Sequence, residues 1–542
     1  MHQNAPQSPH VGVVVIGYND AAHVRDAVRS ALAQGPAVRE VLAVDDCSTD
    51  GSVAALDRLA AGEPRLRVLR RPVNSGGCGS PRNTGLDAVT APYVMFLDSD
   101  DVLPPGAVDA LLTAATAARA EVASGLCVRR ELPSGLEQPW QAPLYQAHAV
   151  LAHPSRLPRL VHDTLCVNKL YRTGFLREHG IRFPEGRFLY EDFVFTARVL
   201  AAGPRIALVP DPVYVWHVRR SAGRLSLSLD RAGIDNWRAR TRACALVYDI
   251  LLEAGQKAPA REARAKFLDH ELRMYVRELP DRDAQYRRAW WAHTRAYLAG
   301  YDAADWELNP TAPGRLIARV VLESPEPRDL PRLRELAARP ARLLPPYART
   351  PDGTPVWAGD LPQVALTPFL TRPLPSLPLA VDAELRPGAR ATGLRLRWRL
   401  RLRLRLHDLY GRVARADPEA VDVEWRRRED GHPDRRRTSV FAPAGDGVSW
   451  TTEASVDPGA LGEGTWDLRL HVRFADGAQR EVTAHAVAGA GLLRPRALPS
   501  VRHGVLLVRP YATRSGALAL RVATGARGVG KLVRGRLHRL LH

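Results

Sequence analysis

Three aspartates with one serine among them end a short apolar run, where Val94–Leu97 is followed by Asp98, Asp100 and Asp101. Such a run, bounded by prolines on both sides, is typical of a buried strand in a parallel sheet, and ligands of these sheets collect at the carboxyl ends of the strands. Along an extended chain Asp98 and Asp100 point to one side and Asp101 points away. The first two carboxylates therefore need a counter-charge if they share one site.

This acidic segment has two interpretations. A divalent ion on a nucleotide diphosphate suits the site, because magnesium and manganese prefer one or two carboxylates together with phosphate oxygens. The alternative is a solvated acidic turn after the strand, since an Asp-x-Asp pattern is common. The spacing by itself leaves both interpretations open.

Alternating strands and helices surround this segment and predict an α/β fold. Runs of β-branched residues predict strands, and apolar residues at three- and four-residue steps predict helices. The spacing is typical of βαβ units in a parallel sheet with right-handed crossovers. The predicted strands cover 11–16, 41–44, 67–69 and 94–97. The first predicted helix starts at an N-cap on Asn19 or Asp20 and ends before Gly35, and the second covers 52–61.

Two common nucleotide-binding folds lack their signatures here. A dinucleotide fold carries Gly-x-Gly-x-x-Gly directly after its first strand, but this chain has Gly17, Tyr18 and Asn19 there. The glycine-rich segment 74–85 comes after the third strand instead, and it contains no Gly-Lys-Ser or Gly-Lys-Thr. A phosphate-cradling kinase loop is therefore also absent from this segment.

Five sequence blocks occur in a fixed order, namely Val13–Asn19, Val44–Asp50, Asn74–Gly77, Arg82–Gly85 and Phe96–Asp101. Together they resemble the family 2 glycosyltransferases of GT-A fold, a Rossmann-like fold that binds nucleotide-diphospho-sugars. The ordered combination is more specific than any single block. The resemblance runs over residues 11–225 and implies an enzyme of this class.

The resemblance also implies which side chains hold the nucleotide. Tyr18 would stack on the base, and Asp46 would accept a hydrogen bond from a ring nitrogen. The alternatives are a half-buried aromatic residue at a strand end for Tyr18 and a turn-forming residue for Asp46. Asp98 would lie on the ribose side. The other implied nucleotide-binding residues are Asn19, Gly76, Gly77, Arg82, Asn83 and Arg219.

A second pair of acids, Glu191 and Asp192, follows the segment 183–190. The resemblance places the general base of an inverting transfer at Asp192, with Glu191 as its orienting neighbour. A carboxylate that opens a helix meets the positive end of the helix dipole and stays ionised, which suits a base. The alternative is that both acids only favour the helix dipole.

The segment 214–221 resembles the family's tyrosine-rich strand, which leads into a basic loop over the pyrophosphate. His217 stands where arginine is frequent, so it is either a metal ligand beside Asp100 or a hydrogen-bond donor to a phosphate. Arg219 is the candidate for neutralising the diphosphate leaving group, because a guanidinium binds two oxygens at once. Its alternative is an ordinary surface arginine.

The composition limits the class of protein. A chain of 542 residues with 45% hydrophobic content is too long for one core and predicts two or three domains. Five scattered cysteines predict free thiols and a cytoplasmic protein. No apolar run reaches the roughly 20 residues that span a bilayer, and the first ten residues do not resemble a signal peptide. The formal charge of +19 predicts polyanionic partners.

The chain is predicted to contain six segments, because helical periodicity gives way to prolines and then to strict strand alternation. The strand-rich part loosely resembles modules appended to glycosyltransferases that decorate wall teichoic acids. The segments are a disordered N-terminus (1–10), a GT-A catalytic domain (11–225), a helical region packed on it (226–335), a Pro-rich linker (336–374), a β-sandwich (375–490) and a basic C-terminal segment (491–542).

Two basic stretches have alternative interpretations. Residues Arg395–Arg405 alternate with leucine and tryptophan, which predicts a strand with guanidinium groups roughly 6.6 Å apart on one face. This face either binds a polyphosphate or only keeps the strand soluble. The tail 526–541 either lies on the inner face of the plasma membrane as a peripheral contact or is a disordered or oligomer-packing tail.

The sequence therefore predicts an inverting, metal-dependent glycosyltransferase that uses Mn²⁺ or Mg²⁺. We expect it to move a sugar from a nucleoside diphosphate, UDP in first place, to a hydroxyl of a cell-surface polysaccharide, a teichoic-acid-like polymer or a lipid-linked glycan. The alternative is a non-catalytic protein that binds polyanions or glycans on a transferase scaffold. No nucleic acid partner is expected. The sugar, the acceptor and the oligomeric state are left open.

Overall fold

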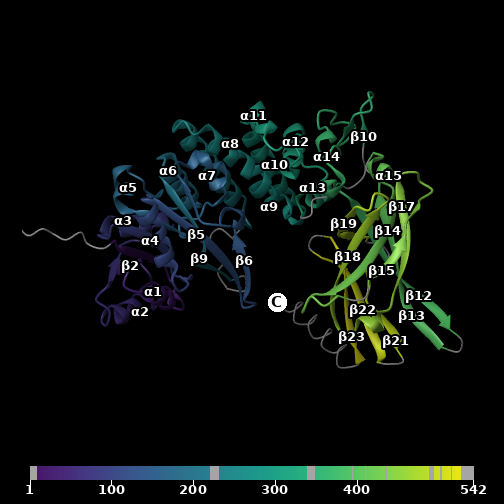
Figure 1. The fold of residues 1–542 in the computed structure, drawn as a ribbon, viewed down its shortest axis with the longest axis horizontal. Helices are drawn as coiled ribbons and strands as arrows, with labels where there is room; N and C mark the ends of the chain where they lie inside the picture. The colour runs from purple at the N-terminus through teal and green to yellow at the C-terminus, as the bar shows by residue number, and fades with distance from the viewer. Residues whose placement is uncertain are drawn as a thin grey trace, which may run out of the picture. The chain divides into compact units, whose positions relative to one another are not determined.

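The computed structural model describes residues 9–219, 231–338, 343, 348–392, 395–408, 410–433, 436–487, 493–500, 503–513 and 516–525, with side chains outside 389–398. The chain divides into two compact units, Met1–Phe267 with Gly300–Leu308 and Leu268–Ala299 with Asn309–His542. The colour in Figure 1 begins at purple in the first unit and ends at yellow in the second. Most of the predicted disordered N-terminus and all of the tail 526–542 lie outside the described residues.

Four parallel strands form the part of the first unit's sheet that carries the acidic segment. Their order is β3-β2-β1-β4, and the apolar side chains of β1, β2 and β4 are almost fully buried, as expected for parallel strands. The predicted α/β fold is confirmed, and a helix occurs at both predicted places, although the first has its N-cap at His23 rather than at Asn19 or Asp20. The elements are β1 (Val11–Gly17), α1 (Val24–Leu32), β2 (Val38–Asp45), α2 (Ser52–Ala60), β3 (Leu66–Arg70) and β4 (Tyr93–Asp98).

The rest of this sheet is mixed, whereas the sequence predicts a parallel one. Strand β8 (Lys169–Arg172) lies antiparallel between β4 and β5 (Val122–Leu132). It follows a long segment without a crossover helix, so the handedness that keeps βαβ strands parallel does not apply. Strand β9 (Ile206–Arg219) is parallel to β5, while β6 (Leu136–Trp140) and β7 (Ala149–Leu151) pair antiparallel with β5 and β9.

The glycine-rich segment contributes a helix rather than only a loop. Helix α3 (Gly79–Ala88) starts inside it and packs against β1 and β2. Gly85 permits this packing, because a Cβ there would lie 2.2 Å from Val14. The other helices of the first unit are α4 (Ala107–Ala118), α5 (Thr173–Glu178), α6 (Glu191–Ala201), α7 (Ile234–Glu253), α8 (Lys257–Lys266) and α11 (Ala303–Glu307).

The predicted helical region 226–335 is divided between the two units. Helices α7 and α8 bury Ala243, Val247, Leu251 and Ala260 in the core of the first unit. Helix α11 also belongs to the first unit. The other helices of this region belong to the second unit, where α12 packs on α10 and α13 on α9. They are α9 (Arg273–Val276), α10 (Ala284–Leu298), α12 (Pro313–Glu323) and α13 (Leu330–Ala337).

The described part of 336–374 is packed structure, so its prediction as a linker is wrong. It contains the short pair β10 (Ala348–Arg349) and β11 (Pro355–Val356) and the helix α14 (Thr367–Leu370). Trp357 is buried, and the Arg332 guanidinium lies 3.8 Å from its ring centre. The prolines here open turns and helices, where a missing N–H costs nothing, so they do not prevent packing.

The C-terminal part of the second unit is the predicted all-β sandwich. Its two sheets have the strand orders β16-β17-β13-β12-β20 and β15-β14-β18-β23-β22-β21, and both contribute to one apolar core. The strands are β12 (Ala380–Thr392), β13 (Arg395–His407), β14 (Pro418–Arg427), β15 (Arg437–Val440), β16 (Ala442–Pro443), β17 (Ser449–Val456), β18 (Gly464–Phe474), β19 (Gln479–Val482), β20 (Ala484–Ala486), β21 (Arg496–Ser500), β22 (Gly504–Ala512) and β23 (Leu518–Thr524).

Strands β21–β23 correct the predicted boundary at 490, because β23 pairs with β18 and extends the same sheet. Along β13, the leucines at 400, 402, 404 and 406 are buried, while the arginines alternating with them from 399 to 405 are at least partly exposed. The predicted alternation is therefore confirmed for this described part. The side chains of Arg395 and Arg397 lie outside the description.

Two further observations concern the cysteines and the length of the helices. All five cysteines are free thiols, as predicted. Among the residues that the structure describes, no helix has the length and apolar character needed to cross a membrane.

Candidate active site

The carboxyl ends of β1, β2 and β4 meet at one edge of the sheet. Ile16 on β1 is paired with Asp98, and Gly17 is paired with Asp45. The residues that directly follow these strands, Tyr18 and Asp46, are therefore brought close to Asp98. Tyr18 has 37% of its surface exposed, and its stacking on a base stays a prediction.

Asp46 is buried and held by the loop that follows β3. Its Oδ2 accepts hydrogen bonds from the Ser75 N–H at 3.0 Å, the Ser75 hydroxyl at 2.8 Å and the Asn74 amide at 3.0 Å. Arg71 Nε lies 2.8 Å from Oδ1 as an ion pair without hydrogen-bond geometry. A base would therefore have to reach Oδ1, which is itself buried beside Arg71. Sequence reasoning missed Arg71, because nothing distinguishes it in a chain rich in arginine.

Asn19 shapes the loop after β1. Its backbone is in the left-handed region, with φ at 51°. The Asn19 N–H donates to the Ser48 hydroxyl at 2.9 Å, and its side-chain oxygen accepts from the Thr49 N–H at 2.7 Å. These bonds join the loops after β1 and β2, which positions the neighbouring Tyr18.

The predicted nucleotide-binding residues Gly76, Gly77 and Asn83 pack against the segment 183–188. A Cβ on Gly77 would lie 2.6 Å from the Gly186 carbonyl oxygen, and Gly76 has a φ of 76° with Arg187 beside it. Asn83 is 1% exposed, and its amide bonds to the backbone of Phe183 in both directions. In this structure the Asn83 amide is used to hold the segment that leads to α6.

Arg82 connects the two acidic parts of the site. Its Nη2 donates to Asp98 Oδ1 at 2.7 Å, and its Nη1 donates to Glu191 Oε1 at 2.6 Å. Burial works against the guanidinium charge, but Asp98 and Glu191 raise the pKa of Arg82 above its ordinary value. The end of β4 and the start of α6 are therefore joined through one buried cation.

Asp192 lies beside this cation in the first turn of α6. Its Oδ1 accepts a hydrogen bond from the Phe193 N–H at 3.1 Å. Burial, reinforced by the charge of Glu191 and opposed by that of Arg82, raises the pKa of Asp192 to about 7. Burial also raises the pKa of Glu191, with Arg82 opposing it. A carboxylate whose pKa lies near neutral pH can accept a proton at physiological pH.

Asp100 and Asp101 have opposite environments, as the alternation along the chain predicts. Asp101 is buried, accepting from the Tyr214 hydroxyl at 2.7 Å and the His217 N–H at 2.7 Å. The Asp100 side chain is 45% exposed. Burial and the charges of Asp98 and Asp20 raise the pKa of Asp100 to about 6, against the pull of Arg219.

His217 and Arg219 both reach Asp100 from β9. His217 Nδ1 lies 3.0 Å from the Asp100 carbonyl oxygen, and Arg219 Nη1 donates to the same oxygen at 2.9 Å. Burial lowers the pKa of His217 and favours the neutral ring. With Nδ1 donating to the carbonyl, Nε2 carries the free lone pair that a metal or a donor group would meet.

Asp100 and His217 fit a divalent ion only if phosphate oxygens or water complete the coordination of the ion. No group of three or more acidic, histidine or cysteine side chains that could hold a metal occurs among the described residues. Burial, together with the charges of Asp98 and Asp20, nevertheless raises the pKa of Asp100, and the closeness of these carboxylates favours a cation there. Magnesium and manganese accept one or two carboxylates when phosphate oxygens and water supply the rest.

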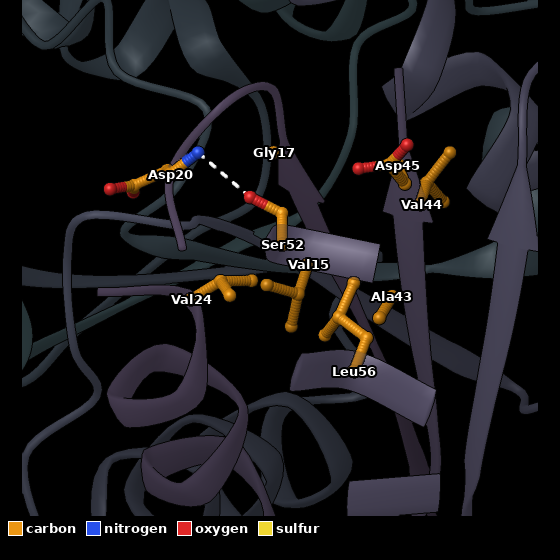
Figure 2. Close-up of a pocket in the computed structure, with 9 residues that line it drawn as sticks. All are labelled: Val15, Gly17, Asp20, Val24, Ala43, Val44, Asp45, Ser52 and Leu56. Carbon is orange, nitrogen blue, oxygen red and sulfur yellow. Dashed lines mark hydrogen bonds between the residues drawn. The ribbon is translucent and has the colours of Figure 1, made fainter. Parts of the chain in front are cut away.

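A small pocket lies among β1, β2, α1 and α2, close to this edge. Figure 2 shows Asp20 donating from its N–H to the Ser52 hydroxyl, at 2.9 Å. Most of the other lining residues are apolar, so they offer no group for a diphosphate. They are Val15, Gly17, Val24, Ala43, Val44, Asp45 and Leu56. The polar site is therefore the edge formed by Tyr18, Asp98 and Asp192 and not this pocket.

The fold and the arrangement of acids define a GT-A domain. Residues 12–180 match the model of the family described as glycosyl transferase family 2, and the N-terminal domain belongs to this family. Among curated proteins, the succinoglycan biosynthesis protein ExoO of Rhizobium meliloti is 31% identical over 231 residues, which cover 41% of this chain and 64% of ExoO.

The names of two further relatives include poly(ribitol phosphate). The beta-N-acetylglucosaminyltransferase TarS of Staphylococcus aureus is 30% identical over 40% of this chain and 36% of TarS. The beta-glucosyltransferase of Bacillus spizizenii is 25% identical over 40% of this chain and 34% of its own length. The chain thus spans less than two thirds of the length of ExoO and of these two relatives.

Solved structures extend the likeness in fold. Crystalline S. aureus TarS superposes with a TM-score of 0.51 and 18% identity, covering 95% of this chain and 85% of that one. A shorter TarS chain in complex with UDP-GlcNAc gives a TM-score of 0.50 and 21% identity, covering 64% of this chain and 96% of that one. At these identities the comparison confirms the fold, including an all-β C-terminal part.

Proposed function

We propose that the chain is an inverting glycosyltransferase that moves a sugar from a UDP-sugar to a hydroxyl of a cell-surface glycan. The observation that carries this is Asp192, a carboxylate with a pKa of about 7 that lies beside the buried Arg82 bridge at the nucleotide edge. A general base works best when its pKa is near the working pH. The family of the N-terminal domain and the ligand named for the TarS complex support the choice of donor.

In the proposed reaction Asp192 removes the proton of the acceptor hydroxyl while its oxygen bonds to the anomeric carbon. The bond from that carbon to the diphosphate breaks at the opposite side, and the nucleoside diphosphate keeps the electron pair. Glu191 stays on Arg82, which fixes the first turn of α6. Tyr18 stacks on the base, Asp46 Oδ1 accepts from its ring nitrogen, and Asp98 lies toward the ribose.

Asp100 is the residue that we propose to hold Mg²⁺ or Mn²⁺, with His217 Nε2 as a second ligand or as a donor to a phosphate. When bound, such an ion would neutralise the negative charge that builds on the leaving diphosphate. Arg219 would add a second cation to the same diphosphate, since it already lies at Asp100.

We further propose an anionic acceptor, such as a teichoic-acid-like polymer. The exposed arginines of β13, with a net charge of +19 for the chain, support this choice. The two relatives whose names include poly(ribitol phosphate) act on a polymer of this kind. Membrane contact through the tail and self-association stay predictions.

A panel of sugar nucleotides, each incubated with and without Mg²⁺ or Mn²⁺, tests the donor proposal. We expect metal-dependent release of UDP from one UDP-sugar and little release from GDP- or TDP-sugars. A chain that binds poly(ribitol phosphate) but releases no nucleotide from any donor would support the non-catalytic scaffold instead.

A further inference from the structure

Two half-buried tryptophans, Trp140 on β6 and Trp216 on β9, lie on neighbouring parts of the first unit's sheet. The Trp140 and Trp216 ring centres are 6.0 Å apart at an interplanar angle of 80°. The Arg129 guanidinium lies 5.3 Å from the Trp216 ring centre. On β5, Arg129 is paired with Trp216 of β9, and Cys127 is paired with Trp140 of β6. These three side chains, Trp140, Trp216 and Arg129, are called the tryptophan patch.

The tryptophan patch lies across β9 from the groups that contact Asp100. Successive side chains of a strand point to opposite faces, so Trp216 faces away from His217. His217 and Arg219 both bond to the Asp100 carbonyl oxygen. The proposed diphosphate and metal residues therefore occupy one face of β9, and the tryptophan patch occupies the other.

The same face is connected to the helix that carries the proposed base. The Trp140 indole N–H donates to Asp163 Oδ1 at 3.2 Å. The next residue, Thr164, accepts at its carbonyl oxygen from the Thr196 hydroxyl of α6 at 3.1 Å. Because α6 begins with Glu191 and Asp192, the segment 163–164 joins the tryptophan patch directly to the helix of the general base.

The segment that makes this connection is rigid. Lys169 Nζ donates to Asp163 Oδ2 at 2.8 Å, the Asn168 amide donates to the same oxygen at 2.8 Å, and both residues are buried. Buried and mutually bonded polar groups of this kind fix one conformation. The Trp140 ring is therefore held in place before any ligand arrives, which lowers the entropic cost of binding.

The aromatic rings and the guanidinium of the tryptophan patch suit a sugar unit that lies next to an anionic group. The carbon-bound hydrogens of a sugar ring pack on aromatic rings, and a guanidinium pairs with phosphate or carboxylate oxygens. The Arg129 side chain is 22% exposed, and its guanidinium lies 3.8 Å from the Glu131 carboxylate. We propose that the tryptophan patch is the acceptor subsite and takes a sugar or polyol unit next to an anionic group. This inference rests on the proposed function.

The test uses Trp216→Ala in the full chain. Calorimetry measures binding of two probes, poly(ribitol phosphate) for a phosphate source and a uronic-acid oligosaccharide for a carboxylate source. We expect one probe to bind the parent, and Trp216→Ala to weaken it about tenfold, which is about 1.4 kcal/mol. Because this substitution leaves the net charge unchanged, the loss reports ring packing rather than general attraction to a polyanion.

Three further variants sharpen the test. Trp216→Phe keeps an aromatic ring and is expected to keep most of the affinity, and Arg129→Gln is expected to reduce its salt dependence. Val150→Ala, an exposed valine on β7 of the same sheet, is the control and is expected to bind as the parent does. UDP-sugar hydrolysis without acceptor is measured for every variant and is expected to stay within about twofold.

Two results would overturn the subsite: equal probe affinity in Trp216→Ala and the parent, or no binding of either probe by the parent. If Trp216→Ala loses hydrolysis as well as probe binding, Trp216→Phe decides, because hydrolysis kept and probe binding lost in that variant would contradict ring packing at the subsite. Failure of the parent to hydrolyse any UDP-sugar would count against the proposed function alone, since probe binding does not depend on turnover.

Discussion

Arg82 Nη1 donates a hydrogen bond to Glu191 Oε1 at 2.6 Å, although the two residues are 109 positions apart in the chain. The Arg82 side chain is 4% exposed and the Glu191 side chain is 12% exposed, and Asp98 occupies the other arm of the guanidinium. A cation placed between two carboxylates offsets their mutual repulsion, so the two can lie close together. The relationship makes the position of α6, and with it Asp192, dependent on α3.

Replacing Arg82 with glutamine tests this dependence. The substitution leaves Glu191 and Asp98 without their buried partner, which we expect to cost about 3–5 kcal/mol of unfolding free energy. Arg182→Gln is the control, since its pair with Asp87 is largely exposed and should cost less than about 1 kcal/mol. Urea unfolding of both variants gives the comparison, and equal losses would mean that the Arg82 bridge is not structurally important.

Replacing Asp192 with asparagine tests the proposed base. We expect turnover to fall by about a hundredfold or more, because a general base contributes on this order, while UDP-sugar affinity stays near that of the parent. Steady-state kinetics and a direct donor-binding measurement separate the two effects. Near-normal turnover in Asp192→Asn would assign the base to another residue.

The pH dependence of turnover follows from the raised pKa of Asp192. Its carboxyl must be ionised to accept a proton, so turnover is expected to rise as pH increases through about 7 and then to level off. Glu191 titrates with it as a pair, so the profile reports an apparent value. A rate that is already maximal at pH 5 would contradict the raised pKa.

Asp100 links metal binding to pH in the same direction. Its pKa of about 6 means that a proton competes with the ion below that pH, so the Mn²⁺ concentration for half-maximal activity is expected to rise on acidification. Asp100→Ala is expected to weaken metal and donor binding together. Calorimetric titration of UDP with and without Mn²⁺ measures both, and loss of only one would separate the ion from the donor site.

The arginines of β13 give a prediction about the acceptor. Changing Arg399, Arg401 and Arg403 to glutamine in the full chain is expected to reduce retention on immobilised poly(ribitol phosphate), most strongly at low salt. The matched control changes the same residues to lysine, which keeps the charge. If the glutamine variant is retained as well as the parent, this face only keeps the strand soluble.

The sequence determined the parts of the site that depend on local order. An apolar run followed by polar residues indicates a parallel strand and its carboxyl end, and the ends of β1, β2 and β4 are adjacent in the structure. The roles of Tyr18, Asp46 and Asp98 toward a nucleotide are implied by the family resemblance. The strict leucine and arginine alternation of β13 was visible for the same reason, because a strand has a period of two.

Only the tertiary structure decided how these pieces are used. Asn83 and Gly77 pack on the segment 183–188, and Arg71 reaches Asp46, because these contacts depend on how distant segments fold together. Strands β21–β23 went unpredicted, since two of them contain proline and their pairing with β18 joins residues far apart in the chain. The pKa of Asp192 likewise depends on burial and on Glu191 and Arg82 together, which no local pattern encodes.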